Sequence, residues 1–277
     1  MSGAARPEPF ELLALRYAHH SGRKGSDNFL GGADLHESGS DLAYFIWVAR
    51  RSDKLFVIDT GFGPEAAERR GRTLLRKPAD ALELVGIDAG RVDDVILTHM
   101  HYDHAGSLGD FPKARFHIQD AEAAYATGRC MCHHALNHPY DVENVVDYVR
   151  CLYHGRVHFH DGVSELAPGF LLHRVGGHSA GLQVVRVWTR RGWVVVASDA
   201  THLYANIEQR RPFPVISSLA DMMEGFDTLH RLADTPNHIV PGHDPLVMKR
   251  YAAPSADLEG LVVRLDDAPR VTAERGA

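Results

Sequence analysis

The segment that most constrains this 277-residue chain places four possible metal ligands within six residues: His99, His101, Asp103 and His104. It follows directly on residues 92–99, an apolar run typical of a buried strand. His99 and His101 alternate along the extended backbone and would project from one side. Asp103 and His104 follow one turn later, where an Ala-Gly pair allows a close bend into a helix. Four ligands are too many for one ion, so the segment predicts two ligands for each of two adjacent metal ions.

Three further candidate ligands lie downstream, and each ends an apolar run beside a small residue. His178 lies in GGHSAG after FLLHRV, Asp199 lies in ASDA after WVVV, and His243 lies in PGHD after HIV. Strand ends of this kind place functional side chains on a rigid scaffold. The three residues would complete the coordination of two ions.

Composition excludes several classes of protein. The net charge of −6 lacks the basic surplus that binding to nucleic-acid phosphates needs, so we expect no nucleic-acid partner. No apolar stretch approaches the roughly 20 residues of a membrane helix, and the first residues lack an apolar signal core. The three cysteines are an odd number, which favours a reducing cytoplasm over a disulfide framework. The 19 histidines are an unusually high count, and their positions must decide what they do.

Hydrophobic patterning predicts both strands and helices in each half of the chain. We expect strands at 12–18, 43–49, 54–59, 92–99, 115–118, 157–160, 170–175, 182–188, 193–198 and 238–240. We expect helices in two pieces within 64–85, broken around Lys77-Pro78, and then after Asp120, at 142–153 and at about 219–233. Strands followed by helices in both halves indicate two sheets packed together with helices outside.

We interpret residues 1–277 as a single domain. A Gly/Ser/Asp-rich loop at 19–42 is long enough to serve as a lid or a dimer contact, so the chain is expected to be a monomer or a homodimer. The polar residues 266–277 are expected to fray. His19, His20, Arg23 and Lys24 in the early loop would suit an acidic substrate or a lid, although a solvated basic loop is the simpler interpretation. The histidines of the predicted strands are interpreted as structural: His117, His158, His160 and His173.

The motifs HMHYDHAG, GGHSAG, ASDA and PGHD together resemble the metallo-β-lactamase superfamily in its dinuclear hydrolase branch. The resemblance extends from VIDTG at residues 57–61 to His243. It implies an α/β fold, the αββα sandwich, in which two mixed sheets pack face to face with helices outside and the metals lie at one edge. It also implies one metal held by His99, His101 and His178, a second held by Asp103, His104 and His243, and Asp199 bridging the two. Asp59 corresponds to a buried acid near the site.

The ligand types predict hydrolytic chemistry. Nitrogen and carboxylate ligands without thiolate suit two divalent ions, zinc first, with iron, manganese or cobalt as alternatives. Two ions about 3.5–4 Å apart can bind a bridging hydroxide, which would attack a substrate carbonyl. Asp103 and Asp199 would then act at the reacting centre, and Asp199 could pass a proton to the leaving oxygen.

The superfamily member that this chain resembles most is an N-acyl-homoserine lactonase. Asp199 stands where true β-lactamases have cysteine or serine, and ASDA followed by Tyr204 and then PGHD are similar to the lactonase group. Those lactonases carry a substrate-contacting tyrosine three residues after the bridging aspartate, where this chain has His202. We therefore predict that His202 or Tyr204 contacts the carbonyl of a small lactone, whose ring type stays open. The alternatives are a thioesterase resembling glyoxalase II, a hydrolase of another ester, and a ligand-binding member without turnover.

Overall fold

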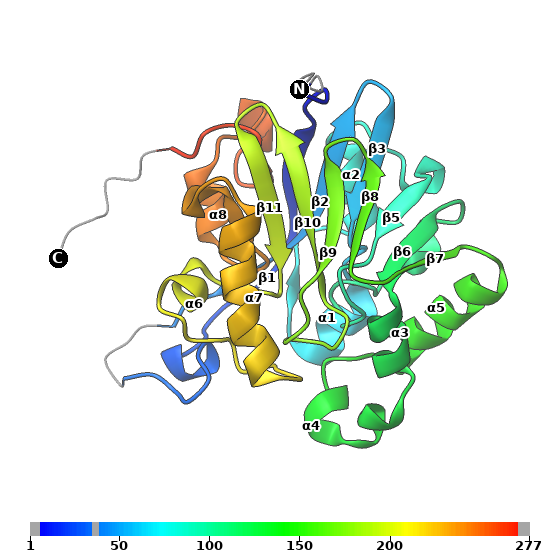
Figure 1. The fold of residues 1–277 in the computed structure, drawn as a ribbon, viewed down its shortest axis with the longest axis vertical. Helices are drawn as coiled ribbons and strands as arrows, with labels where there is room; N and C mark the ends of the chain where they lie inside the picture. Colours follow the sequence, from blue (N-terminus) through cyan, green and yellow to red (C-terminus); the bar gives the residue numbers. More distant parts are fainter. Residues whose placement is uncertain (1–5, 35–38, 271–277) are drawn as a thin grey trace, which may run out of the picture.

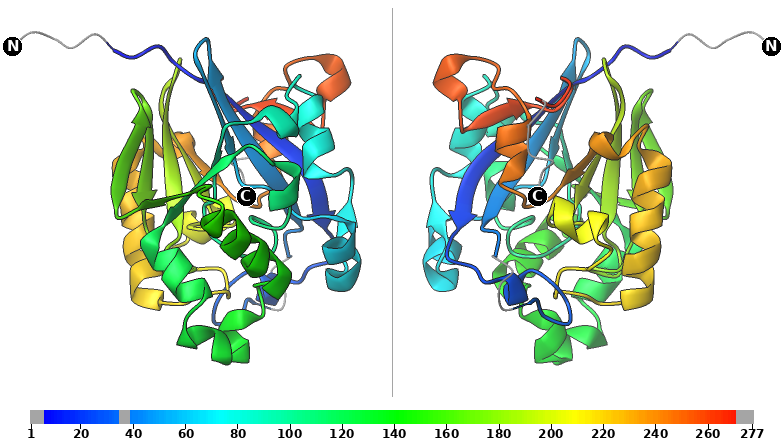
Figure 2. Two further views of the ribbon diagram at one scale, coloured as in Figure 1. Left: turned by 90° about the vertical axis from the view of Figure 1, so that its right-hand side faces the viewer. Right: turned by 90° about the vertical axis from the view of Figure 1, so that its left-hand side faces the viewer.

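Two sheets packed face to face form the centre of the molecule, and helices cover both outer faces (Figure 1; Figure 2). The structure is a computed structural model that describes residues 6–34 and 39–270. The αββα arrangement predicted from the sequence is confirmed.

The first sheet is mixed. Its strands run in the order β13 (Val262–Arg264), β1 (Glu11–His20), β2 (Leu42–Arg51), β3 (Lys54–Ile58), β5 (Asp94–Ile96), β6 (Arg115–Gln119) and β7 (Val157–His160), and β4 (Thr73–Leu74) pairs with β1. Pairing is antiparallel from β13 to β3 and parallel from β3 to β7. Because β3 and β5 are parallel, the loops that follow them leave at the same edge of the sheet.

The second sheet has the order β12 (Ile239–Pro241), β11 (Gly192–Ser198), β10 (Gln183–Thr189), β9 (Phe170–Arg174) and β8 (Val163–Ala167). Strands β9 and β11 are both antiparallel to β10, and β12 is parallel to β11. Strands β9, β11 and β12 therefore point the same way, and their carboxyl ends lie at one edge of the sheet.

Side-chain alternation divides the core into layers. Leu12 and Ala14 of β1 face the second sheet, whereas Leu13 and Leu15 face the opposite way. Between the sheets, Phe56 of β3 stacks on Phe170 of β9 with ring centroids 4.1 Å apart. Burial on both faces explains why these strands read as nearly continuous apolar runs.

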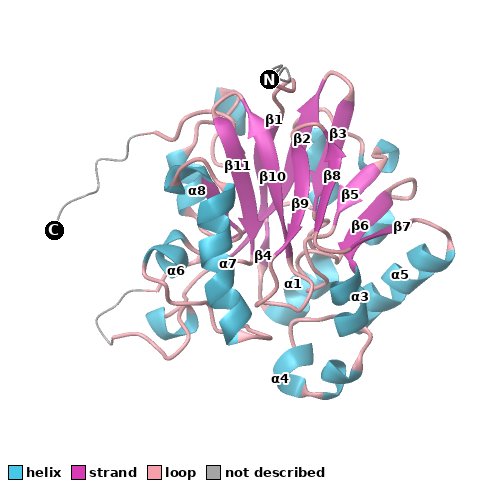
Figure 3. Ribbon diagram, in the orientation of Figure 1, coloured by secondary structure: helices cyan, strands magenta, loops and turns pink. Residues whose placement is uncertain are grey.

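The helices pack against the outer faces (Figure 3). Those covering the first sheet are α1 (Pro64–Arg70), α2 (Pro78–Glu83), α3 (Asp120–Ala126) and α5 (Val142–Tyr153), with α4 (His134–Asn137) between the last two in the chain. Helix α7 (Leu219–Leu232) covers the second sheet, where Met222, Phe226 and Leu229 meet Val184 and Val195. The remaining helices are α6 (Tyr204–Glu208) and α8 (Leu246–Arg250), with short 3-10 turns at Gly25–Asp27, Ala89–Arg91, Leu108–Asp110, Arg129–Cys132, Pro236–His238 and Ala256–Leu258. None of the helices in the described part of the chain combines the length and apolar character that a membrane crossing requires.

Several predicted boundaries are wrong. The strand expected at 92–99 is hydrogen-bonded only over β5, and strands β8 and β13 were not predicted. The tail does not fray from residue 266, because Asp266 is buried and its carboxylate forms ion pairs with Arg190 and Arg264. Residues 271–277 lie outside the described residues.

Candidate metal centre

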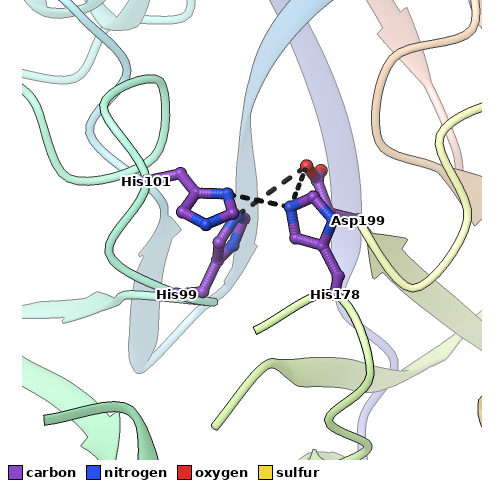
Figure 4. Close-up of side chains that lie close together, drawn as sticks. All are labelled: His99, His101, His178 and Asp199. Carbon is purple, nitrogen blue, oxygen red and sulfur yellow. Dashed lines mark hydrogen bonds and ion pairs between the residues drawn. The ribbon is translucent and has the colours of Figure 1, made fainter. Parts of the chain in front are cut away.

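The structure brings all seven predicted ligands together at the edge where the strands end. Figure 4 shows His99, His101 and His178 around Asp199. The loop after β5 carries His99, His101, Asp103 and His104, while β9, β11 and β12 are followed by His178, Asp199 and His243. All seven are at most 8% exposed. Their ligand atoms form one group of His99, His101, His178 and Asp199 and another of Asp103, His104 and His243, within 4.8 Å of one another in each group.

The Asp199 carboxylate stands between the two groups, with one oxygen toward each. Its Oδ2 lies 3.1 Å from His178 Nε2 and 3.8 Å from His99 Nε2. Its Oδ1 lies 3.0 Å from His243 Nε2 and 3.3 Å from His104 Nε2. This is the geometry that a carboxylate shared by two cations requires.

Partners behind the ligands orient three of the imidazole rings. His104 Nδ1 lies 2.7 Å from Asp59 Oδ2, His178 Nδ1 lies 2.7 Å from the Val215 carbonyl, and His243 Nδ1 lies 3.0 Å from the Ala43 carbonyl. Each Nδ1 is directed at an acceptor outside the centre, so each Nε2 faces the centre, where His178 Nε2 also lies 2.8 Å from His101 Nδ1. Such outer partners are usual for metal-binding histidines because they fix both the tautomer and the ring orientation.

Unpartnered buried atoms and neutral histidine rings show that the centre fits metal ions. The Nε2 atoms of His99 and His104 and the Oδ1 atom of Asp199 are buried without a hydrogen-bond partner. Burial lowers the pKa of His99 and of His101 well below the usual value, so both rings are neutral at pH 7. Neutral imidazole nitrogens that converge on a carboxylate in a dry site need a cation to satisfy them. The cluster therefore fits a dinuclear metal site, and its nitrogen and oxygen donors are shared by zinc, iron, manganese and cobalt.

Strained backbone holds the strand ends that aim these side chains. Asp59 (φ 64°) and Ser198 (φ 45°) adopt the left-handed region that L-residues rarely occupy. Thr98 Oγ1 lies 2.9 Å from both Asp59 Oδ2 and Ser198 Oγ, which ties the two sheets together below the centre. A Cβ atom on Gly242 would lie 2.8 Å from Asp199 Oδ1, so this glycine allows the backbone to approach the carboxylate.

The ligand loop after β5 is a tight turn, and the helix expected after His104 is absent from it. The backbone N–H groups of His104 and Ala105 both donate to the His101 carbonyl at 3.1 Å. The Tyr102 N–H donates to the Pro139 carbonyl at 2.9 Å. The turn brings Asp103 and His104 to the second group of ligands without a helix.

Glu122 supports the centre and was not predicted. Its side chain is fully buried, and its Oε1 accepts hydrogen bonds from the Met100 N–H at 2.9 Å and the Tyr140 hydroxyl at 3.0 Å. Its Oε2 accepts from the Gly181 N–H at 3.0 Å. One carboxylate thus joins a ligand loop of each sheet. Acidic residues are common in the first turn of a helix, so no sequence signal distinguished this one.

Of the two residues expected to contact the substrate, the structure places only His202 at the centre. Its Nε2 lies 3.1 Å from Asp199 Oδ2, and its ring stacks on Phe213 with centroids 3.8 Å apart. Burial lowers the pKa of His202 to about 3, so the ring is neutral. The expectation for Tyr204 is wrong, because its ring packs in the core between the sheets, under the Arg250 guanidinium.

A cleft of about 470 Å³ opens above the centre. His101, His178, Asp199 and His243 contribute to its lining, together with His202 and the apolar side chains of Leu42, Phe213, Pro214 and Val215. The early loop reaches the cleft through Arg23, Ser26 and Asp27. A small molecule that enters the cleft would therefore meet both the predicted ligands and this loop.

A model of the metallo-beta-lactamase superfamily matches residues 39–267. This match covers most of the chain, every strand of the sandwich except β1, and every candidate ligand. The protein therefore belongs to the metallo-β-lactamase superfamily, as the motifs predicted.

Several individual proteins are similar to this chain. A probable metallo-hydrolase of Mycobacterium tuberculosis is 26% identical over 76% of this chain and 77% of its own length. An N-acyl homoserine lactonase of Agrobacterium fabrum is 27% identical over 60% of this chain and 66% of its own. A human acyl-coenzyme A thioesterase is 36% identical over 39% of this chain and 36% of its own. An N-acyl homoserine lactone hydrolase, solved with the product N-hexanoyl-L-homoserine at its catalytic metal center, shares the fold with a TM-score of 0.70, 21% identity and coverage of 88% and 96%.

Proposed function

We propose that this metallo-hydrolase opens lactone rings. The observation that carries the proposal is the Asp199 carboxylate, which directs one oxygen to each of two groups of metal-ligating side chains. The similarity to the Agrobacterium lactonase supports the choice of substrate class.

In this proposal two divalent ions, zinc in the first instance, occupy the centre. One would be held by His99, His101 and His178, the other by Asp103, His104 and His243, with Asp199 shared between them. Such ions would supply a water-derived nucleophile at neutral pH and an electrophile for the carbonyl oxygen. The protein would contribute a dry, rigid site in which the ligands need no rearrangement during the reaction.

Two residues of the chain would act on the reacting groups. The surrounding histidines hold the pKa of Asp199 well below its usual value against the effect of burial, so it is ionised and able to take a proton bound for the leaving oxygen. His202 lines the cleft with its Nε2 beside Asp199. We propose that its single N–H turns from Asp199 to the substrate carbonyl and makes the contact that a tyrosine makes in the lactonases.

A thioesterase is the second candidate, favoured by the similarity to the human acyl-coenzyme A thioesterase. A thioester and a lactone present the same carbonyl to the centre and differ in the leaving group and in the rest of the molecule. The expected cytoplasmic location, the lack of a nucleic-acid partner, the single-domain organisation and the monomer or homodimer state stay predictions.

The deciding experiment measures proton release by metal-loaded protein at neutral pH. The substrates are γ-butyrolactone, short and long acyl-homoserine lactones, an aromatic bicyclic lactone, and a thioester. Turnover of a lactone without turnover of the thioester supports the proposal, and the reverse result would replace it with the thioesterase. If none of these substrates is turned over while two metals are bound, both the lactonase and the thioesterase proposals are wrong.

Variants at the two predicted contact positions test the role of His202. His202→Phe should lower kcat/KM for the best substrate by about 10- to 100-fold while two metals stay bound, because one charge-directed hydrogen bond is lost. Tyr204→Phe should change it by less than about twofold, since its ring lies in the core and burial already raises the pKa of its hydroxyl far from physiological pH. Equal kcat/KM in His202→Phe and the parent would remove His202 from the mechanism.

A further inference from the structure

Three arginines from separate segments line the same cleft as the metal ligands. Arg23 lies in the loop after β1, Arg70 is the last residue of α1, and Arg72 precedes β4. All three are half-buried. The chain carries a net charge of −6, so the gathering of three positive charges on one wall is not a consequence of overall composition.

Neutral groups hold the guanidinium groups in place. Arg70 donates to the carbonyls of His138 and Tyr140 at 3.1 Å and lies over the Tyr102 ring at 3.9 Å. Arg72 donates through Nε to the Tyr102 hydroxyl at 3.1 Å and through Nη1 to the Arg70 carbonyl at 2.7 Å. These contacts fix the direction of each side chain and leave its charge uncompensated.

Arg23 is held in the same manner. Its Nε donates to Asn28 Oδ1 at 2.8 Å, and its Nη2 donates to the Asp27 carbonyl. The Asp27 carboxylate also reaches the cleft, but the hydrogen bond it accepts comes from the Lys24 backbone N–H, at 2.9 Å. Arg23 is therefore a packed part of the cleft wall, contrary to the simpler interpretation of a solvated basic loop, whereas Lys24 is exposed.

None of the three arginines has an acidic partner. Within residues 6–34 and 39–270, none of them forms an ion pair with a carboxylate, and the Nε of Arg70 is buried with no hydrogen-bond partner. Some arginines elsewhere in these ranges do pair, such as Arg115 with Asp94, whereas others, such as Arg156 and Arg186, donate to backbone carbonyls without an ion pair. What distinguishes these three is that they line one cleft together. A half-buried charge without a partner is costly, which indicates that a ligand supplies the missing anion.

His20 lies between two of the arginines and cannot satisfy both. Its Nδ1 is 3.4 Å from Arg23 Nη1, and its Nε2 is 3.3 Å from Arg72 Nη1. Burial, Arg72 and Arg23 lower the pKa of His20 to about 4, so the ring is neutral at pH 7. A neutral imidazole accepts a hydrogen bond at only one nitrogen. At least one guanidinium N–H therefore remains available to a ligand.

We propose that Arg23, Arg70 and Arg72, the arginine wall, bind an anionic oxygen group of the substrate, a carboxylate or a phosphate, while its scissile carbonyl faces the metal ligands. The planar guanidinium groups present paired N–H donors that match either anion. Anchoring one end of a small substrate would orient its carbonyl over the centre. This proposal names the substrate class for the proposed hydrolysis and rests on it for the reaction. A neutral acyl-homoserine lactone would leave the arginine wall unpaired and is expected to be a poor substrate.

Matched substrates provide the kinetic test. The pair is 5-oxotetrahydrofuran-2-carboxylate and its carboxamide, which differ in charge but share the lactone ring, and a phosphorylated hydroxymethyl analogue tests phosphate as the anion. We expect kcat/KM to be about 10- to 100-fold higher for an anionic member than for the carboxamide, the scale of one or two charged hydrogen bonds. The carboxylate and phosphate substrates together identify which anion is preferred. Equal values for all three would overturn the proposal.

Substitutions connect the preference to the wall. Arg72→Gln and Arg23→Gln should reduce the ratio of kcat/KM for the anion to kcat/KM for the carboxamide toward unity, with the metal content of the parent. Arg72→Lys should retain part of the preference because it keeps the charge and loses the planar fork. Arg231→Gln, an exposed position on α7 outside the cleft, is the matched control for loss of one positive charge. A preference that survives in both glutamine variants would contradict the assignment.

Two further experiments test the arginine wall independently of the proposed lactonase activity. The charged and neutral pair is repeated as thioesters of glutarate and of its monoamide, so that a thioesterase still reports the preference. Equilibrium titration of metal-loaded protein with glutarate and with glutaramide requires no turnover. Glutarate should bind the parent at least about tenfold more tightly than Arg72→Gln, and glutaramide should not distinguish them. Equal affinity of the parent and Arg72→Gln for glutarate would contradict the arginine wall as an anion site, whatever reaction the centre catalyses.

Discussion

Two clusters of histidines lie at different places in this molecule and are built for different purposes. The five predicted histidine ligands of the metal centre, and His202 beside them, occupy loops that follow strands. His117 on β6, with His158 and His160 on β7, forms the second cluster within neighbouring strands at the edge of the first sheet. Both clusters include an aspartate, so the presence of histidine and carboxylate together does not distinguish them.

In the edge cluster, both ring nitrogens of His117 and of His160 have hydrogen-bond partners. His117 Nδ1 lies 3.0 Å from His160 Nε2, and His117 Nε2 lies 3.0 Å from Asp94 Oδ1. His160 Nδ1 in turn lies 2.9 Å from Ser164 Oγ. These contacts close a hydrogen-bonded chain, which agrees with the structural role predicted for these histidines.

In the metal centre, the two nitrogens of a histidine ring have different roles. One nitrogen of His104, of His178 and of His243 contacts an acceptor behind the ligand, and the other faces Asp199. The number of histidines is therefore a weaker guide to metal binding than the ring nitrogens that the fold directs at one shared carboxylate. The comparison can be tested by breaking each cluster in turn.

The largest expected effect is loss of the metals from His178→Ala. Removing one nitrogen from the first group should empty at least one position and lower kcat/KM by more than about 10³-fold, as expected for an essential group. Elemental analysis of the purified protein, together with turnover, measures both. His160→Ala is the control and should keep the metal content of the parent. Full activity in a metal-depleted His178→Ala protein would contradict the role of the centre.

A smaller effect is expected from Asp59→Asn, which leaves all ligands in place. The amide cannot accept the His104 N–H as strongly as the carboxylate does, so metal affinity should fall by about 10- to 100-fold. Competition with a chelator measures the affinity. Asp94→Asn, which changes the aspartate of the edge cluster, is the control and should keep the metal affinity of the parent. If Asp94→Asn lowered the metal affinity as much as Asp59→Asn, the special role of Asp59 behind His104 would be contradicted.

The smallest effect is a dependence of stability on pH from His160. Burial, with the nearby His117 and His158, lowers its pKa to about 4, and only Asp120 acts in the opposite direction. A histidine whose pKa is lowered by folding stabilises the protein above its unfolded pKa of 6.5 and loses that contribution as the pH falls toward 4. The ring is partly exposed, so the loss should be about 1 kcal/mol or less.

Urea unfolding at pH 7.5 and pH 5 tests this prediction on the parent and on His160→Gln. The difference in the free energy of unfolding between the two pH values should be smaller in the variant. Acid release of metal affects both proteins equally and cancels in the comparison. An identical difference in both proteins would assign the pH dependence to other groups.

The sequence predicted the sandwich and the cluster of ligands for the same reason. A long apolar run that ends in a polar ligand identifies both a strand and its carboxyl end, as before His99 and Asp199. Strands that lack this contrast were missed, because β8 (VSELA) alternates at an exposed sheet edge and β13 is only three residues long. The extent of the turn after His101 depends on backbone hydrogen bonds that no local pattern encodes.

The cleft wall could not be predicted from sequence. Arg70 and Arg72 lie at a helix end and before a two-residue strand, where arginine is usually solvated. Their common wall exists only because α1 and β4 pack beside the ligand loop after β5. Tyr204 is the opposite case, a residue that was predicted in the site and lies outside it. It was predicted there because it is near Asp199 in sequence, but it is the first residue of α6 and its ring lies in the core.

The centre takes its ligands from both sheets, and these parts of the chain are synthesised at different times. The loop after β5 leaves the ribosome first, whereas His178, Asp199 and His243 belong to the second sheet and follow much later. A nascent chain that extends only as far as β7 holds no carboxylate between two groups of ligands and no Gly181 N–H to engage Glu122. Tight metal uptake thus requires that the two sheets have already docked, and metal content becomes a measure of completed folding.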